Sequence, residues 1–197
     1  MTRNIVFRIV AAGAAVAALG TAACTRATSS DTAQARVERG KYLVTVGGCN
    51  DCHTPLKMGP KGPEPDFSRM LSGHPESLSI QGAITPASEK WMMTADASGT
   101  AFSGPWGVSF AANLTPDQNT GLGIWTEQMF MDTLRKGRHM GASREILPPM
   151  PWFNYSKMTE EDLKAVYAFL RTIQPVQNHV PAPLPPAAPQ IARTESE

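Results

Sequence analysis

Two cysteines and a histidine form the one pattern in this sequence whose residue types and spacing specify a reaction. Cys49, Cys52 and His53 stand as C-x-x-C-H within residues 48–54. Two thiols three residues apart can each add to one vinyl group of a haem, and an imidazole directly after the second thioether is then held against the iron. The pattern predicts Cys49 and Cys52 as the attachment points of one haem c and His53 as its proximal ligand.

Other uses of neighbouring cysteines have weaker support. A thioredoxin-like redox pair needs a βαβ context, whereas the flanks here are a predicted helix and a Gly/Pro-rich loop. A structural zinc site needs four ligands, often with a second pair at short spacing, and the other histidines (His74, His139 and His179) are isolated. A disulfide across two residues is strained, and three Cys in total cannot form a closed framework.

The chain offers ten methionines as candidates for a second iron ligand. Most fit ordinary packing on helices, in a staple or as gap-filling apolar residues: Met129, Met131, Met158, Met92 and Met93. Met150 differs because it lies in L-P-P-M-P-W at 147–152, where prolines fix the backbone and remove donors. We expect Met150 to be the distal ligand. An open sixth position, or a bis-histidine centre that uses His74 or His139, is the alternative.

Aromatic and apolar side chains near these segments are candidate walls of the haem pocket: Trp106, Phe110, Leu147, Trp152 and Phe153. A basic cluster at 135–139 lies close to the distal segment in sequence. It could meet an acidic partner or the haem propionates, although the solvated end of a helix is the more frequent reason for such a run.

The first 24 residues have the pattern of an export signal. A basic start with Arg3 and Arg8 precedes the apolar run 9–19 and small residues up to Cys24. The end of this segment resembles a lipobox, so Cys24 is a candidate lipid anchor; simple cleavage and retention as an anchor are the alternatives. We expect an exported, periplasmic protein attached to the membrane through a lipid or its signal, or not attached.

Composition excludes several classes of protein. The chain has 197 residues, a formal net charge of +1, 18% charged and 42% hydrophobic residues. These values argue against a disordered acidic protein, a polytopic membrane protein and a nucleic-acid binder. Without the signal the net charge is near −1, so no basic stripe remains. We expect no nucleic-acid partner.

The rest of the chain divides by composition. Residues 25–32 are small and polar and predict a flexible tether. Helices are predicted at 33–46, 127–135 and 160–173, with Thr126 and Thr159 as N-caps and Gly137 closing the second helix. Residues 54–115 are rich in Gly and Pro, with a short hairpin expected at 102–110. The tail, 175–197, has polyproline character and either wraps the domain or hangs free.

The order of these segments resembles the class I c-type cytochromes. C-x-x-C-H, N-L-T-P-D at 113–117, T-G-L-G-I-W at 120–125 and M-P at 150–151 are similar in particular to the haem modules in cytochrome subunits of membrane-bound bacterial alcohol and sugar-acid dehydrogenases. The similarity covers residues 36–186. It implies an all-α, cytochrome c-like fold around one haem, with a domain at 33–174 that contains a long irregular insertion at about 57–112.

The resemblance also implies roles for single residues. Cys49 and Cys52 become the haem attachments, His53 the proximal ligand and Met150 the distal ligand. The first and last helices should cross, with Gly40 giving close approach to an aromatic residue such as Tyr167. Those subunits carry several C-x-x-C-H motifs, whereas this chain has one.

The function expected from this pattern is transfer of single electrons between a dehydrogenase and a respiratory cytochrome or oxidase, without enzymatic activity of the chain itself. A closed His/Met site favours the electron carrier, because it leaves no open iron position for a substrate. A haem enzyme or gas sensor with an open or bis-histidine site is the rival function. A lipid-tethered structural module without haem is the third.

Overall fold

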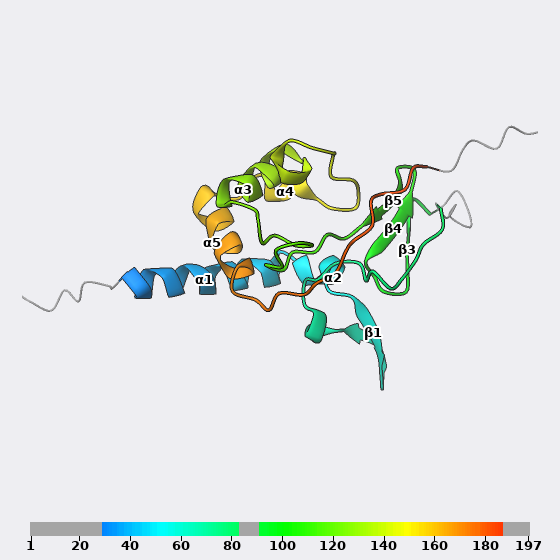
Figure 1. Cartoon of the computed structure of the whole chain (residues 1–197), viewed down its shortest axis with the longest axis horizontal. Coiled ribbons are helices and arrows are strands. Elements are labelled where there is room, and N and C mark those ends of the chain that lie inside the picture. The colour runs from blue at the N-terminus through cyan, green and yellow to red at the C-terminus, as the bar shows by residue number, and fades with distance from the viewer. Residues whose placement is uncertain (1–28, 83–90, 187–197) are drawn as a thin grey trace, which may run out of the picture. The chain divides into compact units, whose positions relative to one another are not determined.

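The computed structural model describes residues 29–82 and 91–186 (Figure 1). The expected export signal with Cys24 and the end of the tail lie outside these residues. The described helices and strands, in chain order, are α1 (Ser29–Val46), α2 (Cys49–His53), β1 (Leu56–Gly59), β2 (Gly62–Pro65), η1 (Phe67–Arg69), β3 (Thr94–Ala95), β4 (Ala101–Gly104), β5 (Gly107–Phe110), α3 (Glu127–Lys136), η2 (His139–Gly141), α4 (Trp152–Tyr155) and α5 (Glu160–Leu170). In these described ranges no helix has the length and apolar character needed to cross a bilayer.

The expectation of an all-α fold is wrong, because the structure contains two antiparallel sheets beside its helices. One sheet pairs β1 with β2, and the other has the order β3-β4-β5. Both lie in the Gly/Pro-rich insertion. Glycines with positive φ allow its tight turns, at Gly62 (φ 119°) and Gly107 (φ 93°). The hairpin expected at 102–110 is present as β4–β5, with Ala101 opposite Phe110.

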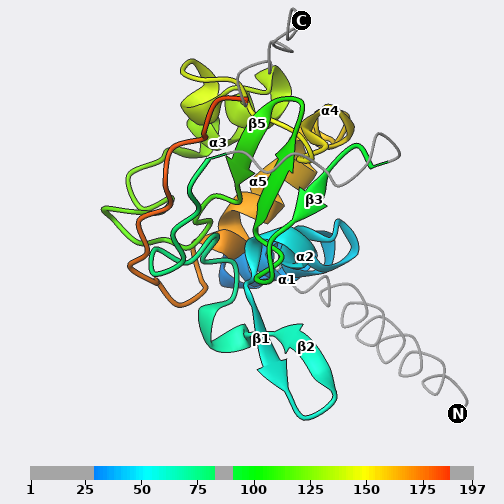
Figure 2. The same ribbon diagram turned by 90° about the vertical axis from the view of Figure 1, so that its right-hand side faces the viewer.

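The β1–β2 hairpin extends away from the helices in both ribbon views (Figures 1 and 2). Its two prolines, Pro63 and Pro65, lie opposite Met58 and Leu56. In a hairpin closed at Gly59 and Gly62 these are the positions whose amides point away from the partner strand. Proline therefore costs no ladder hydrogen bond here and leaves the outer edge of β2 without N–H donors.

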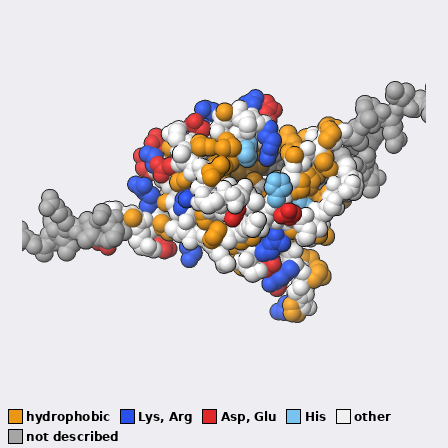
Figure 3. Space-filling model, in the orientation of Figure 1, with side chains coloured by type: hydrophobic (Ala, Val, Ile, Leu, Met, Phe, Trp, Pro, Cys, Tyr) orange, Lys and Arg blue, Asp and Glu red, His pale blue; other side chains and the backbone are white. Residues whose placement is uncertain are grey.

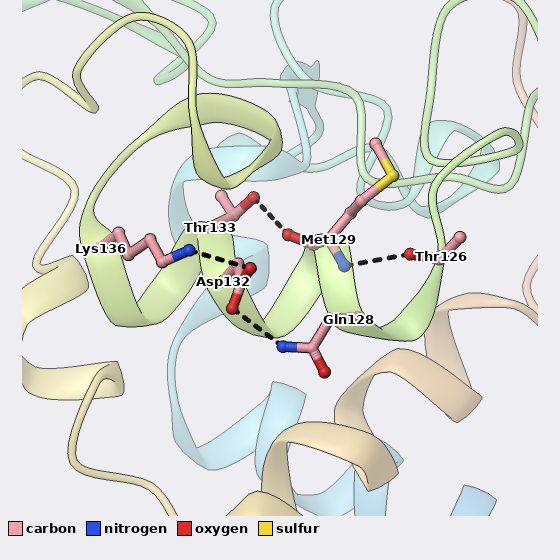
Figure 4. A network of polar contacts seen from close by, with 6 residues as sticks. All are labelled: Thr126, Gln128, Met129, Asp132, Thr133 and Lys136. Carbon is pink, nitrogen blue, oxygen red and sulfur yellow. Dashed lines mark hydrogen bonds and ion pairs between the residues drawn. The ribbon is translucent and has the colours of Figure 1, made fainter.

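Helix α3 begins and ends as its sequence predicts. The Thr126 hydroxyl accepts a hydrogen bond from the Met129 amide (3.1 Å), and Gly137 ends the helix with φ 64°. Between these caps, Asp132 accepts hydrogen bonds from Gln128 one turn before and Lys136 one turn after, at 2.9 and 3.0 Å (Figure 4). Local interactions of this kind explain why the predicted helix 127–135 and the observed helix agree within one residue.

The first and last helices cross at Gly40, as expected. A Cβ on Gly40 would collide with the Ala165 carbonyl oxygen and would lie 2.8 Å from Cβ of Phe169. The aromatic residue at the crossing is therefore Phe169 and not Tyr167, whose hydroxyl instead donates to the Trp125 carbonyl (2.6 Å). Helix α1 starts at Ser29, four residues before the expected start, and α5 ends three residues before its expected end.

The described part of the proline-rich tail, residues 175–186, runs along the domain and does not hang free (Figure 1). Leu184 forms a two-way backbone bridge with Val108 of β5, at 2.9 and 3.0 Å. Asn178 is 1% exposed and donates through Nδ2 to the carbonyls of Ser72 and His74, at 2.7 and 2.8 Å. Asn113 donates to the Val176 carbonyl (2.8 Å) and holds the start of the segment.

Candidate functional site

Helix α2 brings both cysteines and His53 together directly after α1. The chain leaves α1 through Gly48, which adopts a left-handed conformation (φ 67°) and precedes Cys49. Cys49 and Cys52 are three residues apart in one helical turn, so their side chains lie on the same face, and both are half-buried. The Tyr155 hydroxyl of α4 donates to the Gly47 carbonyl (2.6 Å) and fixes α4 against this turn.

Both thiols are poor nucleophiles at neutral pH in the folded chain. Burial raises the pKa of the Cys49 thiol to about 11, and Asp51 and Cys52 contribute in the same direction. Burial, followed by the Asp51 carboxylate, also raises the pKa of Cys52. Redox-active C-x-x-C pairs depend on a lowered cysteine pKa. The environment of Cys49 and Cys52 therefore argues against the thioredoxin-like alternative.

His53 is 8% exposed and is oriented by one strong hydrogen bond. Its Nδ1 donates to the Ala112 carbonyl at 2.7 Å. Burial lowers the pKa of His53, although the bond to Ala112 acts in the opposite direction. The ring is therefore neutral at physiological pH with its proton on Nδ1. This leaves the Nε2 lone pair available, which is the state required of a histidine that binds a metal.

Met150 lies on a different segment, between η2 and α4, and is half-buried. The Ser109 hydroxyl of β5 donates to the Pro148 carbonyl (2.5 Å), and the Met150 carbonyl accepts from the Trp152 amide (2.9 Å). Ser109 is three residues before Ala112, which follows the end of β5, so the Cα atoms of these two residues are no more than about 11 Å apart. The same stretch of chain thus holds the Met150 segment and the acceptor of His53.

The five candidate wall residues do not act alike. Phe110 packs on the buried ring of His74 (centroids 4.8 Å apart), Trp152 packs against Gly137, and Phe153 is 57% exposed. Trp106 has a buried Nε1 with no hydrogen-bond partner among the described residues. Buried donors are nearly always paired. Trp106 lies in the β4–β5 turn, where its ring packs against Gly104. Leu147 is half-buried.

The basic cluster at 135–139 is occupied by local contacts. Arg135 donates to the Ser156 carbonyl, and Lys136 pairs with Asp132. Arg138 donates to the Ser143 carbonyl (2.8 Å), while the ring of His139 lies edge-on to Trp125 (5.1 Å). On the face seen in Figure 3, acidic and basic side chains are interspersed over α3 and α5, and hydrophobic side chains gather over the three-stranded sheet. The cluster fits its simpler interpretation as a solvated helix end.

The residues present fit a covalently bound haem. Two thiols on one helical turn, a neutral imidazole with a free Nε2 and a thioether on a stiff segment are the donor set of a c-type haem site. The sequence already predicts these side chains. It does not predict the Ala112 carbonyl or the Tyr155 hydroxyl: the first belongs to the backbone and carries no side-chain signal, and the second acts on a residue 108 positions away.

A C-x-x-C-H helix whose histidine donates to a backbone carbonyl is the arrangement expected of a c-type cytochrome, and the relatives of this chain are cytochrome subunits. The chain is 30% identical over 142 residues to the fructose dehydrogenase cytochrome subunit of Gluconobacter japonicus, covering 71% of this chain and 22% of that protein. It is 29% identical over 157 residues to the cytochrome c subunit of the quinone alcohol dehydrogenase of Gluconobacter oxydans, covering 78% and 25%. A third relative, the gluconate 2-dehydrogenase cytochrome c subunit of Pantoea cypripedii, is 27% identical over 159 residues, which are 80% of this chain and 28% of its own length. No family model matches the chain.

The chain is a homologue of the cytochrome c subunits of bacterial dehydrogenases, which confirms the resemblance stated above. These relatives imply haem c as the cofactor. They are named as cytochrome subunits, in agreement with an electron-transfer protein and not an enzyme. The chain spans at most 28% of the length of these relatives.

Proposed function

We propose that this protein is an exported c-type cytochrome with one haem, which carries single electrons between a dehydrogenase and a respiratory acceptor. Cys49 and Cys52 hold the haem, His53 is its proximal ligand and Met150 its distal ligand. The observation that carries the proposal is the state of His53: buried, neutral and hydrogen-bonded through Nδ1 to Ala112, with Nε2 left for iron.

The residues of this chain would restrict the haem to electron transfer. A haem c bound here supplies a one-electron couple. Two thioethers from one helical turn fix the ring in place, so little reorganisation accompanies the change of charge. His53 is held by its hydrogen bond, and Met150 by a proline-framed segment that Ser109 anchors. A neutral thioether and apolar surroundings favour the ferrous state, so we expect a moderately high midpoint potential.

The bis-histidine alternative has less support. His74 is 0% exposed, and its Nε2 and Nδ1 contact the Leu78 carbonyl (2.8 Å) and the Thr100 hydroxyl (2.9 Å). Binding iron through His74 would break these contacts inside the core. His139 packs edge-on against Trp125 and lies 3.4 Å through Nδ1 from the Ser143 hydroxyl.

The location and organisation of the chain complete the proposal. Residues 1–24 direct export to the periplasm, with Cys24 as lipid anchor. The tether expected at 25–32 is shortened to 25–28, because residues 29–32 belong to helix α1. Residues 33–174 form the cytochrome domain, and residues 175–197 the tail. The proposed partners are a dehydrogenase as donor and a respiratory cytochrome or oxidase as acceptor. A Cys24→Ser variant should move from the membrane to the soluble fraction; unchanged fractionation would contradict lipid anchoring.

The site is tested by spectroscopy of protein produced with a cytochrome maturation system. The wild type should carry one covalent haem by mass and show the weak sulfur-to-iron band at the red edge of its ferric spectrum. Met150→Ala should lose this band and bind carbon monoxide. Met92→Ala, at a side chain that is 75% exposed, is the matched control and should keep the band.

Two results would contradict the proposal. Colourless protein from a working maturation system would exclude the haem, and an unchanged Met150→Ala spectrum would exclude this ligand. Potentiometric titration gives an independent check, because a strongly negative midpoint potential is incompatible with a buried His/Met centre. Genes beside this one would indicate the dehydrogenase to use as donor in a reduction assay.

A further inference from the structure

A buried segment without regular secondary structure, residues 71–75, lies directly against the proximal ligand. All five residues are buried. The Gly73 amide donates to the His53 backbone carbonyl (2.8 Å), and the His74 amide donates to the Ala111 carbonyl (2.9 Å). The next carbonyl along, that of Ala112, accepts the proton of His53 Nδ1. The segment therefore contacts both the main chain of the ligand and the residues after β5 that orient its ring.

Gly73 makes the closest of these approaches. A Cβ at this position would collide with the Ala111 carbonyl oxygen and would lie 2.6 Å from the carbonyl carbon and 2.7 Å from the carbonyl oxygen of Ala112. That oxygen is the acceptor of His53. Any side chain at position 73 must displace it, because real Cβ contacts are not found under 3.0 Å. The absence of a side chain at Gly73 thus allows the 2.7 Å bond between Ala112 and His53.

Buried hydrogen bonds made by His74 and Asn178 restrict the movement of this segment. His74 donates through Nε2 to the Leu78 carbonyl, which can only accept, so in the neutral ring Nδ1 accepts from the Thr100 hydroxyl. The ring also packs on Phe110. On the other side, Asn178 donates to the carbonyls on both sides of Gly73, those of residues 72 and 74. Movement of Gly73 away from Ala112 would break buried hydrogen bonds.

We propose that Gly73 is a positioning residue for the proximal haem ligand, supported by His74 and by Asn178 of the tail. This inference rests on the proposed function, in which His53 binds the haem iron. Gly73 acts through the Ala112 carbonyl. Because Gly73 has no side chain, this carbonyl can lie within hydrogen-bond distance of the His53 ring. The tail segment thereby contributes to the site, although it contains none of the predicted haem ligands.

The expected consequence is electronic. A strong hydrogen bond from Nδ1 makes the imidazole a better electron donor, and this stabilises ferric over ferrous iron. Weakening the bond should therefore shift the midpoint potential to more positive values. Only a part of the contribution of this hydrogen bond distinguishes the two redox states. We expect the ratio of ferrous to ferric haem at a fixed potential to rise by about threefold.

The test compares two alanine variants of the holoprotein. Gly73→Ala introduces a methyl group against Ala112, whereas Gly82→Ala introduces one where no atom of the described residues lies within 4 Å. The two glycines have nearly the same φ, 77° and 78°, so the strain that alanine experiences at a positive φ is matched. Gly73→Ala should have the more positive midpoint potential. Its His53 Nδ1 proton, observed by NMR of the ferric protein, should exchange faster than in Gly82→Ala.

A second variant serves if Gly73→Ala fails to mature. Asn178→Ala removes both donors to the segment without touching His53 or Ala112, and should shift the potential and the exchange rate in the same direction by a smaller amount. Asn119→Ala, at an exposed side chain, is its control. The midpoint potential and exchange rate of either variant are compared only in protein that has its haem attached and retains its helical circular dichroism signal.

The possible failures are distinguishable. If the wild type attaches no haem, the proposed function is wrong and this inference with it. If the haem is attached but Gly73→Ala equals Gly82→Ala in potential and exchange rate, the positioning role alone is wrong. Where Gly73→Ala does not mature, an Asn178→Ala protein indistinguishable from Asn119→Ala overturns the inference in the same way.

Discussion

Replacing Gly40 by alanine separates the effect of helix propensity from the effect of packing, because the two predict changes of opposite sign. Alanine is a better helix former than glycine, so propensity alone predicts stabilisation of α1 by about 1 kcal/mol. The crossing of α1 and α5 predicts the reverse. A new Cβ would collide with the Ala165 carbonyl oxygen and lie 2.6 Å from its carbonyl carbon and 2.8 Å from Cβ of Phe169.

The cost at Gly40 follows from which atoms must move. The Ala165 carbonyl belongs to the backbone of α5 and cannot turn aside as a flexible side chain can, so the two helices must separate. Overpacking of a tight core typically costs about 1–3 kcal/mol. A contact with backbone lies at the upper end, so we expect a net loss of about 2 kcal/mol after the gain in propensity. For a domain of this size that corresponds to a melting temperature lower by about 4–8 °C.

The assay is guanidinium unfolding of the holoprotein, followed by circular dichroism and tryptophan fluorescence. Lys41→Ala, at the exposed next position of α1, is the control and should change the free energy of unfolding by no more than about 0.5 kcal/mol. A Gly40→Ala protein as stable as the wild type, or more stable, would refute the close approach of the two helices.

Three further predictions concern the thiols, the insertion and the tail. In haem-free folded protein, Cys49 should react with iodoacetamide at pH 8 about a hundredfold more slowly than a free cysteine, because burial raises its pKa to about 11; the rate against pH, by mass spectrometry, checks this. Burial of Asp96 opposes its ionisation, but hydrogen bonds from the Ser98 hydroxyl and three backbone amides prevail and lower its pKa. The stabilisation by Asp96 is therefore present above about pH 4 and disappears as the pH falls through the pKa of the folded state. Asp96→Asn should thus cost about 1 kcal/mol at pH 7 and less at pH 3; an equal loss at both would contradict the assignment. Asn113→Ala should cost about 2 kcal/mol and expose residues 175–186 to limited proteolysis, unlike Asn119→Ala.

Local chemistry explains which elements the sequence could predict. Helix α3 has its N-cap hydroxyl and its C-terminal glycine within eleven residues of one another, and Thr159 caps α5 through the Asp162 amide in the same way. The C-x-x-C-H pattern is also local. Its three side chains lie together in the structure because one five-residue helix contains them all, at positions that share a face.

Apart from the β4–β5 hairpin, the strands of the two sheets could not be predicted in the same way, because they are short and their composition is typical of loops. Strand β2 has the sequence G-P-E-P, and proline normally argues against a strand. Only the pairing with β1 shows that both prolines occupy positions that need no N–H donor. Strand β3 has two residues, too few for any periodicity. The all-α expectation failed where structure depends on pairing and not on propensity.

The acceptor of His53 shows a further limit of sequence reasoning. Ala112 contributes a backbone carbonyl that every amino acid possesses, so its identity holds no information about this role, and no substitution there removes the acceptor. The constraint appears instead at Gly73, where any side chain would displace that carbonyl, and at Asn178, which holds the segment from 105 positions away. In sequence, Gly73 reads as one more loop glycine and Asn178 as a polar residue in a proline-rich tail. Substitutions that alter the electronic state of the proximal ligand should therefore be found at positions 73 and 178 rather than at 112.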